Sequence, residues 1–180
     1  MKIVAIVGMA GAGKSEVARV FEQSGYIRVR FGDVTDEEVG RRGLRLNETN
    51  ERFVREALRA EHGMAAYAKL NIPRIDKALE KANVVVDGMY SWEEYLLLKK
   101  HYSDKLNIVA VWASARKRYF RLSVRDVRPL SRKEAEERDK SEIENLNKGG
   151  PIAMADYALK NESTLYNLKR QTQKLIARLG

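Results

Sequence analysis

The sequence contains no cysteine, and this absence excludes several kinds of chemistry at once. Disulfide bonds, thiolate nucleophiles and cysteine metal sites all require that residue. Histidine is almost as scarce, since only His62 and His101 are present and they show no metal-ligand spacing. A zinc site would therefore need help from carboxylates, and we expect both histidines to lie on helix surfaces.

Long apolar runs are also missing. No window approaches the roughly 18 unbroken apolar residues that a membrane helix requires. Because the first apolar run begins close to Met1, we expect no signal peptide. The chain shows no internal repeat and no low-complexity tract, and its 180 residues fit one domain. We expect a cytoplasmic protein with a single domain over residues 1–180.

Negative charge is in deficit. The chain has 34 Lys and Arg residues against 25 Asp and Glu residues, which gives a formal net charge of +9. This excess favours an anionic partner such as a nucleotide, a phosphorylated metabolite or RNA. A solubilising surface of the kind found in thermophiles has the same composition. Charge alone does not separate these two interpretations.

Short apolar runs alternate with longer helical patterns along the chain. This alternation predicts an α/β fold in which a five-stranded parallel sheet carries helices on both faces. The predicted strands occupy residues 3–8, 26–31, 83–88, 107–113 and 157–161.

Serines mark several helix starts. Two pairs have capping-box spacing and two further serines are predicted N-caps: Ser91 with Glu94, Ser131 with Glu134, Ser114, and Ser163. The last helix is predicted to pack its apolar residues into the core at three-and-four spacing: Leu165, Leu168, Leu175, Ile176 and Leu179.

Two segments are longer than the sheet needs. Residues 34–82 predict a helical region in which Pro73 interrupts one helix. Residues 116–146 are densely charged, and their second helix has little apolar surface to fix it to the core, so we expect a mobile lid. Gly149-Gly150-Pro151 then predicts a hinge, although contact with substrate is an alternative.

The strongest motif lies between the first strand and the first helix. Eight residues match the pattern G-x-x-x-x-G-K-[ST] of a phosphate-binding P-loop: Gly8, Met9, Ala10, Gly11, Ala12, Gly13, Lys14 and Ser15. Glycines let the backbone curl around phosphate oxygens, and the following helix N-terminus adds partial positive charge. Lys14 would neutralise the β- and γ-phosphates of ATP, and the Ser15 hydroxyl would ligate Mg²⁺. The motif predicts a P-loop NTPase.

Two carboxylates follow predicted strands. Asp87 ends the third apolar run, where it would hold a Mg²⁺-bound water or orient the metal; capping of the next helix is the alternative. Asp33 follows the second run and would accept a proton from an acceptor hydroxyl. Its acidic neighbours, residues 36–38, are interpreted as a solvated helix start. Tyr90 and Trp92 would either line an acceptor pocket or pack.

Arginines gather in and beside the charged segment. Guanidinium groups can bridge the oxygens of a transferring phosphoryl group. The set comprises Arg116, Arg118, Arg121, Arg125, Arg128, Arg132 and Arg138. We expect Arg121 and Arg125 to be functional, because a spacing of four places them on one helical face. Pairing with acidic residues on a solvated helix is the alternative for the others.

The chain resembles P-loop kinases of the adenylate kinase and dephospho-CoA kinase group over nearly all of its length. The stretches that carry this resemblance are "GMAGAGKSEVARVF", "RLSVRD" and "ADYALKN". Other stretches resemble an archaeal family of adenylate-kinase-related proteins: "RFGDV", "HGMAAYAK", "DGMYSWEEY" and "ENLNKGGPIAMADY". The resemblance implies that residues 8–15 bind ATP and Mg²⁺, that residues 34–82 bind the acceptor, and that Arg121 and Arg125 belong to the lid. It also implies that Asp33 lies near the acceptor hydroxyl.

The family pattern implies an ATP- and Mg²⁺-dependent kinase for a nucleotide-like small molecule. An RNA-directed kinase or RNA-binding NTPase is one alternative, although the sequence has no basic stripe with interleaved aromatic residues. A nucleotide-dependent switch is another. The sequence leaves open the acceptor, the base of the donor nucleotide and the oligomeric state.

Overall fold

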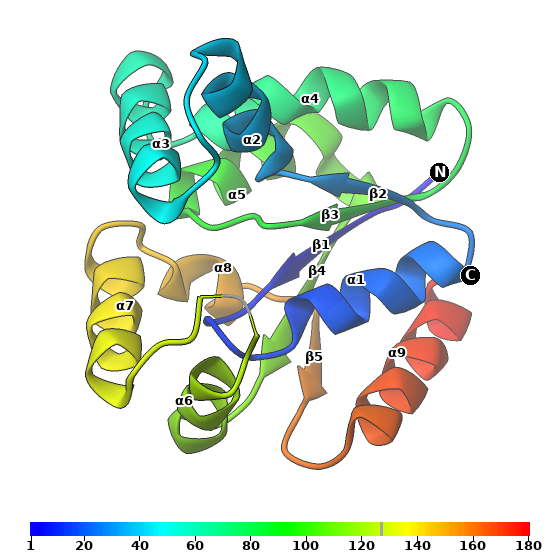
Figure 1. Ribbon diagram of the computed structural model, residues 1–180. Helices are drawn as coiled ribbons and strands as arrows, with labels where there is room; N and C mark the ends of the chain where they lie inside the picture. The colour runs from blue at the N-terminus through cyan, green and yellow to red at the C-terminus, as the bar shows by residue number, and fades with distance from the viewer. Residues whose placement is uncertain (127) are drawn as a thin grey trace.

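The computed structural model describes residues 1–126 and 128–180 (Figure 1). The strands are β1 (Ile3–Val7), β2 (Ile27–Arg30), β3 (Val84–Asp87), β4 (Leu106–Trp112) and β5 (Tyr157–Lys160). The first helices are α1 (Lys14–Gln23), α2 (Asp33–Arg41), α3 (Glu48–His62), α4 (Ala66–Leu79) and α5 (Trp92–Tyr102). A short 3-10 turn, η1 (Ser103–Lys105), precedes β4, and the chain continues with α6 (Ala115–Ser123), α7 (Arg132–Glu144), α8 (Gly149–Ala153) and α9 (Leu165–Leu179).

The strands form one parallel sheet in the order β2-β3-β1-β4-β5. The predicted fold class and its five strands are therefore confirmed. Because β1 is central, the loop that follows it lies in the middle of the carboxyl edge of the sheet. Asp87 is in register with Ile6 on the neighbouring strand, whereas Asp33 follows β2, one strand further away.

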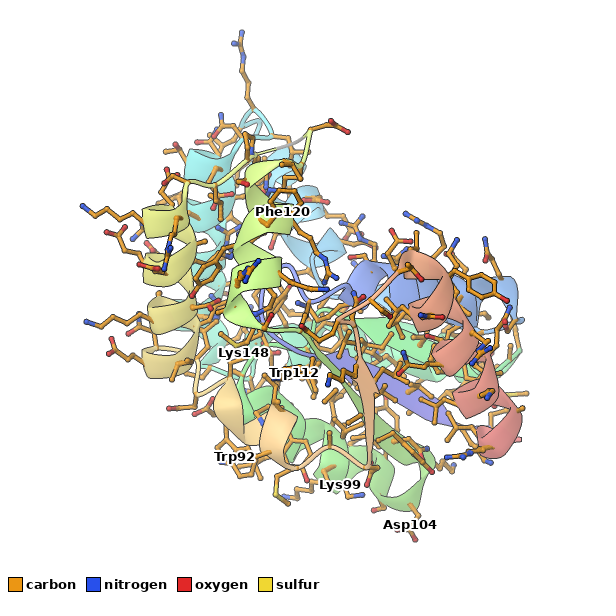
Figure 2. All side chains as sticks on the ribbon, turned by 90° about the horizontal axis from the view of Figure 1, so that it is seen from below. Trp92, Lys99, Asp104, Trp112, Phe120 and Lys148 are labelled. Atoms are coloured by element: carbon orange, nitrogen blue, oxygen red, sulfur yellow. The ribbon has the colours of Figure 1, made fainter. Side chains whose placement is uncertain are left out.

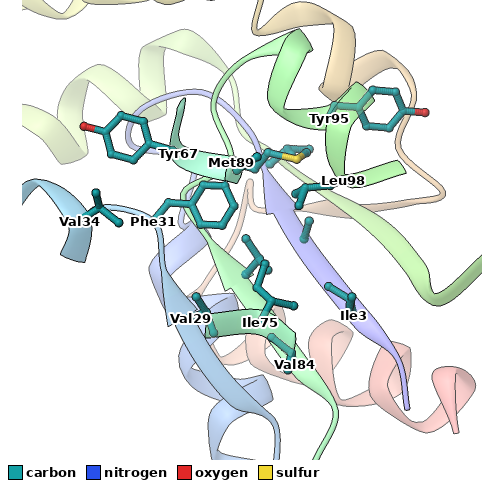
Figure 3. Close-up of a cluster of buried hydrophobic side chains, with 14 of the residues drawn as sticks. Ile3, Val29, Phe31, Val34, Tyr67, Ile75, Val84, Met89, Tyr95 and Leu98 are labelled. Atoms are coloured by element: carbon teal, nitrogen blue, oxygen red, sulfur yellow. The ribbon is translucent and has the colours of Figure 1, made fainter. Parts of the chain in front are cut away.

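The sheet is buried on both faces, as expected for parallel strands. Val4 and Ile6 of β1 pack with α1 and α9, while Ile3, Ala5 and Val7 join the cluster formed with α2 to α5. Figure 3 shows part of this second cluster around Phe31 and Met89. Figure 1 places α6, α7 and α8 at the end of the sheet where β1 opens into its loop.

The capping boxes at Ser91 and Ser131 are both present. Ser114 does precede α6, but its side chain accepts no capping hydrogen bond there. The prediction of Ser163 as a cap is wrong by one residue, because the Thr164 hydroxyl accepts the hydrogen bond that begins α9.

The predicted interruption at Pro73 does not occur. Helix α4 continues through this residue. Proline removes one backbone hydrogen bond from a helix, but the buried side chains of Tyr67, Asn71 and Ile75 hold both halves of α4 against the core. Among the described residues, no helix is both long enough and apolar enough to cross a membrane.

Candidate active site

The P-loop over residues 8–15 has the conformation that its glycines predict. Gly8 and Gly13 have φ angles of 140° and 106°, a region that other residues avoid. A Cβ atom on Gly8 would lie 2.3 Å from the carbonyl oxygen of Val111, and one on Gly13 would lie 2.4 Å from Nδ2 of Asn161. The loop is therefore pressed between β4 and the residue that follows β5.

Four consecutive carbonyl groups of the P-loop accept hydrogen bonds from side chains. Lys14 Nζ donates to Met9 O (3.1 Å), Arg118 Nη1 to Ala10 O (3.1 Å), Arg121 Nη1 to Gly11 O (3.4 Å) and Asn161 Nδ2 to Ala12 O (2.8 Å). The carbonyl and N–H of one trans peptide point in opposite directions. Three of these donors come from outside the loop, so the N–H groups of the peptides that they hold point the other way. The Ala12 N–H donates to Met9 O within the loop, whereas the N–H groups of Gly11 and Gly13 are turned toward the side where a phosphate chain would bind.

Lys14 is the first residue of α1 and lies partly buried. Burial and, after it, the positive charge of Lys148 lower the pKa of its ammonium group to about 7, against the opposing effects of Glu142 and Asp87. An anion bound at the loop would favour the charged form again. The structure thus brings together Lys14, Asp87 and two residues of the α7–α8 region.

Asp87 and Ser15 are the predicted metal ligands. The Asp87 side chain is 11% exposed, and its Oδ2 accepts a hydrogen bond of 2.5 Å from Arg28 on β2. Ser15 lies exposed in the first turn of α1. A hydroxyl and a carboxylate are oxygen donors of the kind that Mg²⁺ takes, with phosphates and waters completing its shell. The donor set fits the predicted ion, and Arg28 orients the carboxylate.

No group of three or more His, Cys, Asp and Glu side chains is placed to hold a metal within residues 1–126 and 128–180. Such a cluster would be needed for a site built from protein ligands alone. The predicted Mg²⁺ site differs because most of its ligands come from nucleotide and water.

Asp33 lies apart from the P-loop. It begins α2, its side chain is 40% exposed, and its Oδ1 lies 3.1 Å from Nη1 of Arg30. Since β3 separates β2 from β1, the carboxylate lies roughly 10 Å across the sheet from the strand that carries the loop. This separation suits a group that contacts an acceptor beyond the phosphates.

The two predicted lid arginines do not share a helical face. Helix α6 ends at Ser123, where the Leu130 N–H donates to Leu122 O and turns the chain, so Arg125 lies beyond the helix. Arg121 also donates to the backbone and side-chain oxygens of Asn161. The expectation of one shared face is therefore wrong, and Arg121 shapes the P-loop itself.

Arg125 faces other cations. Its Nε donates to the carbonyl of Arg128, and burial lowers the pKa of its guanidinium, as do the charges of Arg138 and Arg128. Arg128 in turn pairs with Glu48 and with the buried Glu51 of α3. The predicted lid region therefore contacts the predicted acceptor region.

A hollow opens beside the P-loop on the side of α6. Its volume is about 760 Å³, and Phe120 of α6 is 67% exposed at its wall (Figure 2). The lining residues are Ser114, Arg116, Lys117, Phe120, Arg121 and Glu162. An aromatic ring and guanidinium planes are surfaces on which a nucleotide base can stack.

Helix α7 buries one small apolar residue, Ala135, together with two charged residues, Asp139 and Glu142. Arg118 and Asp139 form a buried two-point ion pair (2.9 and 2.6 Å), and Arg118 also donates to Ala113 O. Glu142 pairs with the buried Lys148 at 2.6 Å. From the sequence alone, pairing on a solvated helix is an alternative for the acidic residues of this segment, Asp139 among them. No motif singles out Asn161, Glu142, Lys148 or Arg28. Asn161 had one sequence signal, since it is a polar residue at the end of a predicted strand.

Two kinds of comparison define the class of protein. A family model described as an AAA domain matches residues 4–147. The crystal structure of TT1252 from Thermus thermophilus has a similar fold, with a TM-score of 0.68 and 22% identity over 99% of this chain and 98% of that one. A shikimate kinase from Bacteroides thetaiotaomicron also has a similar fold, with a TM-score of 0.64 and 14% identity over 99% and 98%. The chain has a P-loop NTPase domain with a kinase-like fold.

The chain belongs to the UPF0200 family. It is 37% identical over 182 residues to the UPF0200 protein of Thermococcus sibiricus, which covers 99% of this chain and 95% of the relative. A UPF0200 protein of Methanococcus maripaludis is 37% identical over 173 residues, with coverages of 93% and 91%. An archaeal P-loop family is therefore confirmed, while the resemblance to adenylate kinase and dephospho-CoA kinase stays a prediction.

Proposed function

We propose that this protein is an ATP- and Mg²⁺-dependent phosphotransferase that acts in the cytoplasm on a nucleotide-like small molecule. The observation that carries this proposal is the P-loop, in which three carbonyls accept hydrogen bonds from side chains outside the loop and Lys14 lies at the base. Protein catalysis of phosphoryl transfer consists almost entirely of positioning and charge stabilisation. The loop supplies both.

The chain's own groups divide the reaction between them. The loop N–H groups and Lys14 hold the β- and γ-phosphates, and the hollow beside Phe120 takes the base. Ser15 and Asp87 would hold Mg²⁺, which neutralises phosphate charge when bound. Asp33 takes the proton of the acceptor hydroxyl while the new O–P bond forms and the bond from the γ-phosphorus to the bridging oxygen breaks, releasing ADP. Arg125 stabilises the negative charge of the phosphoryl group during its transfer.

The resemblance to adenylate kinase and dephospho-CoA kinase supports a nucleotide or a coenzyme precursor as acceptor. Helices α2 to α4 would bind it and the region from α6 to α7 would cover it. The sequence departs from adenylate kinases after β3, where Asp87-Gly88 is followed by Met89 and Tyr90, and no arginine stands within residues 87–92. It also has Val34 and Thr35 where dephospho-CoA kinases carry a second aspartate. An acceptor other than AMP or dephospho-CoA fits these departures.

The direct test is to incubate the protein with labelled Mg-ATP and a panel of nucleotides, coenzyme precursors and tRNA. The proposal expects label on one of the small molecules. Label on tRNA would favour an RNA-directed kinase, and tight nucleotide binding with little turnover would favour a switch. Either of these two results would contradict the proposal.

The two carboxylates are expected to respond differently to substitution. Asp33→Asn should lower the transfer rate by about 10²–10⁴-fold with little effect on ATP affinity, because a proton acceptor acts on the step rather than on the donor. Asp87→Asn should lower both the transfer rate and the affinity for ATP. Steady-state kinetics and nucleotide calorimetry measure the two effects, with Asp36→Asn as the control, since Asp36 lies on the same helix and has the same 40% exposure as Asp33. If Asp33→Asn lost ATP affinity but kept its turnover rate, the two roles would be reversed.

A further inference from the structure

Lys148 is an unusual residue for the start of a short helix. Its side chain is 1% exposed, its Nζ lies 2.6 Å from Oε2 of Glu142, and the ring centroid of Tyr90 lies 4.5 Å away (Figure 2). Lysine is rarely buried, because removing its charge from water costs more than one ion pair returns. Apolar residues of similar size would fill the same space at least as stably. Structural need alone therefore does not account for this cation.

The backbone fixes Lys148 in place. Gly150 lies against Trp92, where a Cβ atom would be 2.5 Å from the indole ring. The Trp92 N–H donates to Leu146 O, and the Lys148 N–H donates to Glu142 O. Both glycines that predicted a hinge lie in α8, and Gly150 is packed against the first residue of α5. Lys148 is thus held against the residues that follow Asp87.

This position places a second lysine beside the P-loop lysine. Among the charged neighbours of Lys14, Lys148 affects its pKa most, and burial lowers the pKa of Lys148 as well. Two cations held close together repel each other unless an anion lies near both. In the protein without ligand the nearby Glu142 supplies that negative charge.

The carboxylate of Glu142 has a partner on each oxygen. Oε2 accepts from Lys148, and Oε1 accepts from Nε of Arg138 at 3.2 Å. If the Lys148 ammonium turned to another anion, Arg138 would still neutralise Glu142. The pair can therefore open without leaving a buried charge unpaired.

We propose that Lys148 is a second phosphate-binding lysine of this site, which Glu142 neutralises until a polyphosphate binds. The ammonium group then contacts a phosphate oxygen beside the one held by Lys14. The inference rests on the proposed function, because it requires that the P-loop bind a nucleotide.

The test compares Mg-ATP binding by calorimetry in wild type, in a variant that removes both charges of the buried pair, and in a variant that removes only the carboxylate. The double variant Lys148→Met/Glu142→Gln removes both charges, so it should keep the fold and weaken ATP binding by about 10–100-fold, the value of a hydrogen bond between charged groups. The Glu142→Gln variant alone should bind ATP at least as tightly as wild type, because no carboxylate then competes with the phosphate for the Lys148 ammonium group. Thermal unfolding without ligand checks that each variant is folded.

The matched control is Lys140→Met/Glu144→Gln, which makes the same change in an exposed pair of α7 (3.9 Å) and should leave affinity unchanged. Wild-type affinity in the buried double variant would overturn the role of Lys148 while leaving the proposed function intact. Weaker ATP binding in Glu142→Gln would also overturn it, since Glu142 would then support binding rather than compete with it. Absence of nucleotide binding to wild type would overturn the proposed function and this inference together.

Discussion

Replacement of Lys14 by methionine is expected to lower the rate of phosphoryl transfer by about 10³-fold or more, the contribution of a single well-placed cation to this reaction. The fold should survive, because the only hydrogen bond of the Lys14 side chain found among the described residues goes to Met9 O, and that carbonyl also accepts from the Ala12 N–H at 3.2 Å. Methionine fills similar volume without a charge to desolvate.

Kinetics and thermal unfolding measure the two parts of this prediction. Mg-ATP should raise the melting temperature of wild type, because a ligand that binds only the folded state stabilises it, and this rise should be much smaller in Lys14→Met. The control is Lys99→Met, since Lys99 is exposed on α5, away from the loop (Figure 2). Turnover in Lys14→Met equal to wild type would refute the role of this lysine.

The buried ion pair between Arg118 and Asp139 should have the largest effect on stability. Asp139→Ala leaves the Arg118 guanidinium buried without its partner, which costs about 3–5 kcal/mol. For a domain of this size such a loss lowers the melting temperature on the order of 10 °C. Loss of the pair also removes the contact that fixes α7 to the carbonyl side of the P-loop.

Denaturant unfolding measures this cost. Glu136→Ala is the matched control, because it breaks the exposed pair with Arg132 (2.9 Å) on the same helix and should cost less than about 1 kcal/mol. Equal losses for the two variants would mean that Asp139 contributes no more than a surface residue, contrary to its burial.

The sequence predicted the sheet and the P-loop well because both have local signals. Strands alternate with helices along the sequence. Gly8, Gly13 and Lys14 belong to one short motif that is contiguous in the chain. The residues that shape the site from outside have weaker signals, since Arg121 is expected in a lid and Asn161 only ends a predicted strand. Arg118, Arg121 and Asn161 reach the loop only through tertiary packing, and their donors cannot be assigned to particular carbonyls before the fold is known.

The burial of helix α7 likewise depends on tertiary contacts that the sequence does not reveal. Its sequence is charged on nearly every face, which predicts a solvated and mobile helix. The structure instead buries Asp139 and Glu142 against Arg118 and Lys148. A sequence shows which side chains carry charge. It does not show which oppositely charged residue, on another element of the fold, pairs with a charge and allows it to be buried.

The central position of β1 in the sheet affects the order in which parts of the molecule can fold during synthesis. β1 precedes the other strands in the sequence, yet it pairs with β3 and β4, and the donors to its loop come from α6 and from the residue after β5. Contacts between segments so distant in the chain form late, because the intervening chain must first be ordered. A nascent chain that ends before Arg118 contains every residue of the P-loop motif. It still lacks Arg118, Arg121 and Asn161, whose side chains hold the loop carbonyls. The P-loop, which is the proposed nucleotide site, is thus among the last parts of the molecule to become complete.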